Sequence, residues 1–99
     1  MSTLRRYSDE EALAILDRLD ESAATLDELV HVAGLKLHDC GEVLLGMEGA
    51  LLIGWRQLGS SSTGTRKLYA LSFKGHLYLV RLRAMAAGQA LLDQLEVKE

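Results

Sequence analysis

The sequence predicts a mainly α-helical protein with one β-hairpin, folded as a single domain over residues 1–99. Three observations carry this prediction. Four segments place apolar residues at helical spacing, two strand-like runs flank a polar loop at residues 59–65, and the chain contains no proline. With 99 residues, of which 48% are hydrophobic, the chain is large enough to bury one core.

Capping residues mark the starts of the first two predicted helices. Ser8 opens the first helix with Glu11 as its capping-box partner, and this helix is expected to end near Asp20. Thr25 opens the second helix in the same way, with Glu28 three residues later. Both starts therefore combine a hydroxyl side chain with a carboxylate one turn further on.

A glycine turn separates the second helix from the third. Gly34 ends the second helix, because glycine adopts the left-handed conformation after a helix without steric cost. The third helix is expected to begin around Lys36 or Leu37 and to end at Gly49. Its buried stripe follows the i, i+3, i+4, i+7 spacing and consists of Cys40, Val43, Leu44 and Met47.

Two strand-like runs follow the third helix. Residues 51–58 are apolar except near Arg56, and within residues 66–72 Lys67, Tyr69 and Leu71 alternate with Leu68 and Ala70. The glycine-bracketed loop between them, residues 59–65, is rich in serine and threonine. Trp55 is expected to pack at the core or its rim rather than to stack on a nucleic-acid base.

Ser72 caps a last helix that is expected to extend to about Leu95. This helix carries two apolar stripes, although a lone helix on a small core needs only one. Exposed apolar surface usually marks an interface. We therefore predict that residues 76–95 contain a dimerisation element, formed by Leu77, Val80, Ala84, Leu91 and Leu95.

Charge is distributed unevenly along the chain, whose net charge is −3. Residues 1–48 contain eleven Asp or Glu and four Lys or Arg. Residues 49–92 contain no acidic residue and six basic ones, which are Arg56, Arg66, Lys67, Lys74, Arg81 and Arg83. Such asymmetry indicates a negatively charged partner for the basic part, although solvated side chains without a partner give the same pattern.

Several segments resemble winged helix-turn-helix regulators, including MarR-like and PadR-like proteins. Residues 25–29 (TLDEL) with 33–35 (AGL) look like the opening of their helix-turn-helix. Leu44, Met47 and Glu48 with residues 51–53 resemble the end of their recognition helix and the start of the wing, and residues 66–75 (RKLYALSFKG) are similar to their second wing strand. The resemblance covers about residues 9–85.

This resemblance implies a three-helix core, a two-stranded wing and a C-terminal helix. It also implies that the third helix enters the major groove of DNA, that the wing contacts phosphates or the minor groove, and that terminal helices form a homodimer. The candidate DNA-binding residues are Lys36, His38, Arg56, Ser61, Ser62, Thr63, Arg66 and Lys67. The hydroxyl-rich loop is equally consistent with a flexible connector.

The third helix departs from the pattern of a DNA-reading helix. Its outer positions are His38, Asp39, Gly41 and Glu42, and phosphates repel carboxylates. Two hypotheses follow. The protein is a homodimeric DNA-binding transcriptional regulator, or it is a winged-helix adaptor that captures a protein partner with this acidic face.

Catalysis, cofactor binding and metal binding are not expected. His31, His38 and Cys40 match no zinc-ligand spacing, and Ser72 with His76 lacks the acid of a hydrolytic triad. The first seven residues contain no apolar signal-peptide segment, and no apolar run approaches the length of a membrane span. A single cysteine excludes an internal disulfide, so we expect a cytoplasmic protein.

Overall fold

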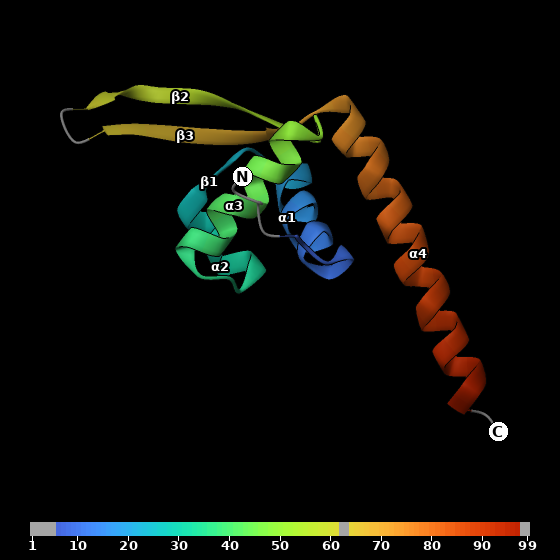
Figure 1. Ribbon diagram of the computed structural model, residues 1–99. Coiled ribbons are helices and arrows are strands. Elements are labelled where there is room, and N and C mark those ends of the chain that lie inside the picture. Colours follow the sequence, from blue (N-terminus) through green and yellow to red (C-terminus); the bar gives the residue numbers. More distant parts are fainter. Residues whose placement is uncertain (1–5, 62–63, 98–99) are drawn as a thin grey trace.

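A computed structural model describes residues 6–61 and 64–97, and it confirms the mainly helical fold with a β-hairpin. The elements follow in the order α1 (Asp9–Glu21), β1 (Ala24–Thr25), α2 (Leu26–Ala33), α3 (Leu37–Gly49), β2 (Ile53–Ser61), β3 (Gly64–Leu71) and α4 (Phe73–Val97). In Figure 1, α1, α2 and α3 form a body from which the β2–β3 hairpin and α4 extend in different directions.

The predicted capping box at the start of α1 is confirmed. The Glu11 backbone N–H donates to Ser8 Oγ at 3.1 Å, and the Ser8 backbone N–H donates to Glu11 Oε1 at 2.9 Å. The predicted second box is wrong, because Thr25 makes no side-chain cap hydrogen bond. Glu28 instead accepts from Arg18 Nη2 at 2.7 Å, so a guanidinium from α1 takes the carboxylate that the box required.

Thr25 also belongs to a strand that the sequence pattern did not predict. Ala24 and Thr25 pair antiparallel with Tyr69 and Leu68, which gives a three-stranded sheet in the order β1-β3-β2. The expected two-stranded hairpin is present, but its root carries this third strand. Two residues are too few to show the alternation that identifies a strand.

The turn between α2 and α3 and the extent of α3 agree with the predictions. Gly34 has φ 66°, and its backbone N–H donates to the Val30 carbonyl. All four residues of the predicted α3 stripe are fully buried. They pack in a core with α1, where Ile15 and Leu16 are fully buried, and with Leu79 of α4.

The hairpin is longer than predicted, because β2 continues to Ser61 and β3 begins at Gly64. The predicted loop at residues 59–65 is therefore wrong at both ends, since Ser61 pairs with Gly64 across the two strands. The pairing is irregular between Leu58 and Ser61. Backbone pairing thus extends through a serine-rich segment whose composition indicated a loop.

The start of α4 packs tightly on the turn that leads into β2. Ser72 Oγ accepts from the Gly75 backbone N–H at 2.9 Å and donates to the Leu51 carbonyl at 2.6 Å. The Ser72 backbone N–H donates to the Leu52 carbonyl at 3.1 Å. A Cβ atom at Gly75 would lie 1.9 Å from the Leu52 carbonyl oxygen, so this approach requires glycine.

Helix α4 is continuous past Gly88 over its 25 residues. Its early turns pack on the core through Leu79 and Leu82, whereas every residue from 83 to 95 is exposed. No helix in the described part of the chain is both long enough and apolar enough to cross a membrane.

Candidate nucleic-acid interface

The hairpin divides its three predicted DNA-binding cations between two faces. Strand register pairs Trp55 with Tyr69 and Arg56 with Leu68. Because successive side chains alternate, Lys67 shares a face with Trp55 and Tyr69, whereas Arg56 and Arg66 lie on the other face. The hairpin therefore carries positive charge on both faces.

Trp55 links the face that carries Lys67 to the end of α3. Its indole Nε1–H donates to Glu48 Oε1 at 2.8 Å, and Lys67 Nζ lies 4.3 Å from the centre of its ring. The side chain is 42% exposed, as expected for a residue at the rim. Burial raises the pKa of the neighbouring Tyr69, and the charge of Glu48 raises this pKa further.

The outer face of α3 has little positive charge. Lys36 lies at its N-cap and is exposed, and it makes no side-chain cap hydrogen bond. The His38 side chain is 85% exposed, with Nε2 3.5 Å from Glu42 Oε1 one turn later. Leu45 is half exposed on the same side of the helix.

Of the serine and threonine candidates, the structure describes Ser61. Ser61 ends β2 and pairs with Gly64. Ser62 and Thr63 lie outside the described residues. The described candidates therefore fall into two groups. Lys36 and His38 lie at the start of α3, and the others lie on the β2–β3 hairpin.

A cluster of charges joins α4 to α1. Arg83 donates through Nη2 to Asp17 and, at 3.1 Å, to Asp20 Oδ2, and its Nε–H donates to Asp17 Oδ1 at 3.1 Å. These hydrogen bonds, with Asp17 the larger influence, raise the pKa of Arg83. His76 Nδ1 lies 3.3 Å from Asp20 Oδ1.

This cluster corrects one interpretation of the sequence. Arg83 belongs to a basic segment without acids, but α1 supplies two carboxylates to it. The contact spans 66 residues along the chain, so local spacing contains no sign of it. The acids that pair with Arg83 are Asp17 and Asp20, which lie three residues apart on α1. Such pairs of acids are common on exposed helices.

The predicted dimerisation stripe lies on the surface of α4. Leu77, Val80, Leu91 and Leu95 are 53–59% exposed, and Ala84 is also exposed. At 100° per residue, these five positions lie on the opposite side of α4 from Leu79 and Leu82, which contact the core. Of the two apolar stripes, the one that contains Leu79 and Leu82 therefore faces the core, and the other is left on the surface.

Cys40 and the histidines are not gathered into a metal site. Cys40 is fully buried, and burial raises the pKa of its thiol. Within residues 6–61 and 64–97, no group of three or more His, Cys, Asp or Glu is placed to hold a metal ion.

Comparison with solved structures supports the same architecture. The DNA-binding protein Sso10a-2 from Sulfolobus solfataricus matches with a TM-score of 0.78 and 18% identity, covering 94% of this chain and 92% of that one. A PadR family transcription regulator from Clostridium difficile matches with a TM-score of 0.72 and 22% identity, covering 89% and 98%.

A MarR family transcriptional regulator from Enterococcus faecalis is similar in structure as well. It matches with a TM-score of 0.73 and 18% identity, covering 88% of this chain and 78% of that one. The fold is a winged helix-turn-helix. No family model and no curated protein matches the sequence.

In winged-helix terms, α2 and α3 form the helix-turn-helix, α3 occupies the position of the recognition helix, and the β2–β3 hairpin is the wing. Trp55 and Glu48 connect the root of the β2–β3 hairpin to the end of α3. Neither residue was among the predicted site residues. An aromatic residue seven positions after an acid gives no local signal of such a contact.

Proposed function

We propose that the protein is a DNA-binding transcriptional regulator that acts in the cytoplasm as a homodimer. One observation carries the proposal: Arg56, Arg66 and Lys67 lie on both faces of a wing that extends from the body, in a segment without acids. The structurally similar proteins include a DNA-binding protein and a transcription regulator, which supports the proposal.

The wing rather than α3 supplies most of the affinity in this proposal. Cations on phosphates release counterions, and hydroxyl groups such as those of Ser61, Ser62 and Thr63 add hydrogen bonds to phosphate. Lys36 and His38 are the polar groups at the start of α3 that reach toward the groove. The carboxylates of α3 are repelled by phosphate, although a carboxylate can accept from the amino group of cytosine.

The homodimer in this proposal forms through the exposed stripe of α4, residues 77–95. A two-fold dimer doubles the phosphate contacts and reads two half-sites.

Fluorescence anisotropy with labelled duplex DNA tests the function directly. The titration uses random duplex and DNA that flanks the protein's own gene, each at two salt concentrations. We expect tighter binding to the flanking DNA and a steep loss of affinity as salt increases. Absence of binding at low salt contradicts the proposal.

A second candidate function follows from the outer face of α3. Among its described residues, this face offers the His38–Glu42 pair and half-exposed Leu45 but no Lys or Arg. An acidic and partly apolar surface suits a basic protein segment, so an adaptor is the alternative. Asp39→Lys with Glu42→Lys should then abolish capture of the partner, and retained capture would count against this role.

A further inference from the structure

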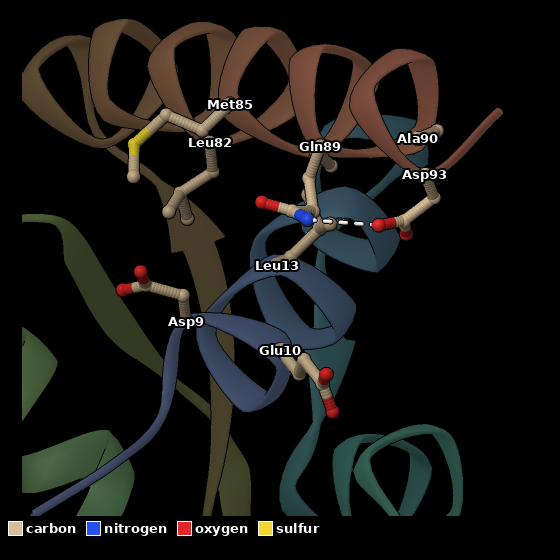
Figure 2. A pocket seen from close by; sticks show the side chains of 9 residues that line it. Asp9, Glu10, Leu13, Leu82, Met85, Gln89, Ala90 and Asp93 are labelled. Atoms are coloured by element: carbon tan, nitrogen blue, oxygen red, sulfur yellow. Dashed lines mark hydrogen bonds between the residues drawn. The ribbon is translucent and has the colours of Figure 1, made fainter. Parts of the chain in front are cut away.

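A groove of about 430 Å³ lies between the N-terminal half of α1 and the second half of α4. Figure 2 shows Leu82 and Met85 pointing from α4 toward α1, and Leu13 pointing back from α1. Ala86 and Ala90 complete the apolar lining, and the exposed Met85 adds a flexible, polarisable surface. The size is within the range of small-molecule sites.

The charged residues at the rim of this groove are all acidic. Asp9 and Glu10 border it on α1, and Asp93 borders it on α4, while none of the lining residues is Lys or Arg. Gln89 Nε2–H donates to Asp93 Oδ1 at 3.0 Å and so orients that carboxylate (Figure 2). Asp93 also lies near the C-terminal end of α4, where the helix dipole adds partial negative charge.

The groove and the proposed dimer stripe use different sides of α4. At 100° per residue, Leu82, Ala86 and Asp93 point away from the stripe that contains Leu91, and Met85 lies between the two sides. A second copy seated on the stripe therefore leaves the groove open. This separation favours a small ligand over a partner helix as the occupant.

We propose that this α1–α4 groove binds lipophilic organic cations. Apolar groups of the ligand pack on Leu13, Leu82 and Met85, and its positive charge is attracted by Asp9, Glu10 and Asp93. The site contains no residue of α3 or the wing. Its test therefore needs no DNA, and it can fail or succeed independently of the proposed function.

Tetraphenylphosphonium is a suitable probe, because tetraphenylborate has the same shape and the opposite charge. Binding is followed by NMR of the methionine methyl groups, since the chain contains only three methionines. Met85 lines the groove, whereas Met47 is fully buried in the core and serves as an internal control. We expect the Met85 signal to shift with the cation, the Met47 signal to stay, and the anion to bind about tenfold more weakly.

Two pairs of substitutions separate the groove from general charge. Glu10→Gln with Asp93→Asn removes two rim carboxylates and is expected to weaken cation binding about tenfold, an effect that salt reduces. Glu21→Gln with Asp27→Asn removes the same charge from exposed positions outside the groove and should leave binding unchanged. Ala86→Trp fills the groove and should abolish binding while the Met47 signal keeps its native position.

Several results would overturn the proposal. They are the absence of cation binding at millimolar concentration, equal binding of tetraphenylborate, and equal losses in the two carboxylate pairs. Dissociation of a dimer by the cation, measured by sedimentation, would also overturn it, because a second copy would then occupy the groove.

Discussion

Gly75 lies where the start of α4 passes over the turn before β2. A methyl group there would meet the Leu52 carbonyl oxygen at 1.9 Å. Backbone must move to accept it, which would break the hydrogen bond from Ser72 to Leu52. We predict that Gly75→Ala lowers the free energy of unfolding by about 3 kcal/mol, measured by urea denaturation.

Gly88 provides the matched control for that substitution. It lies in the same helix, and beyond the adjacent residues and the helix's own backbone no atom lies within 4 Å of the position that a Cβ would occupy. Gly88→Ala should therefore raise the helix propensity of α4 and stabilise the protein by up to about 1 kcal/mol. Equal effects of the two substitutions would contradict the close contact at Gly75.

Cys40 is a core residue whose thiol stays protonated in the folded state. Burial raises its pKa, so the unfolded chain loses this proton first as pH increases. Stability from this group is fully present below about pH 8.5, the pKa of a free thiol, and is lost as pH rises toward the higher pKa of the folded state. Cys40→Ala should remove this part of the pH dependence, measured by urea denaturation between about pH 7 and pH 9.5.

Thiol labelling gives an independent check on Cys40. We expect the native protein to react very slowly with a disulfide reagent at about pH 8 and the urea-unfolded protein to react at once, since buried structural thiols are inert. Rapid labelling of the native state would contradict the burial of this side chain.

Local patterns predicted the helices, and tertiary contacts changed the details. The stripe of α3 was predictable because Cys40 and Met47 belong to one face of a helix, and that face is buried. The prediction that Glu28 takes part in a capping box at the start of α2 was wrong, because Arg18, ten residues away, binds the Glu28 carboxylate at 2.7 Å. β1 was missed because two residues show no period.

The candidate site was only partly predictable for the same reason. Alternation along the strands separates Arg56 and Arg66 from Lys67, but the register that sets this is a property of the paired strands. The contact of Trp55 with Glu48 and the pairing of Arg83 with Asp17 depend on packing between separate elements.

The exposed stripe of α4 leads to a prediction about assembly. Leu91→Glu places a charge within the proposed dimer contact and should raise the dimer dissociation constant by about a hundredfold, measured by sedimentation. Gln89→Glu introduces the same charge on the groove side of α4 and should have little effect. A wild-type protein that is monomeric at high micromolar concentration would contradict the dimer.

Charge in the molecule as a whole is separated between the body and its extensions. The described acids of residues 6–48 lie on α1, α2 and α3, whereas the wing carries cations and no acid. Among the bases of residues 49–92, Arg83 has its charge offset by the carboxylates of Asp17 and Asp20 on α1. This separation orients the molecule in the field of a polyanion, with the wing toward it.

The salt dependence of DNA binding is the sharpest test of a DNA-binding wing. We would compare wild type, Arg66→Ala with Lys67→Ala, and the matched control Lys74→Ala with Arg81→Ala, which removes the same charge from exposed positions on α4. Each phosphate contact contributes about 0.9 to the slope of log affinity against log salt. We expect the wing variant to bind DNA more weakly, and its slope to fall by the contribution of about two phosphate contacts per protomer. The α4 variant should keep the affinity and the slope of the wild type. An unchanged slope in the wing variant would contradict the proposed role of the wing.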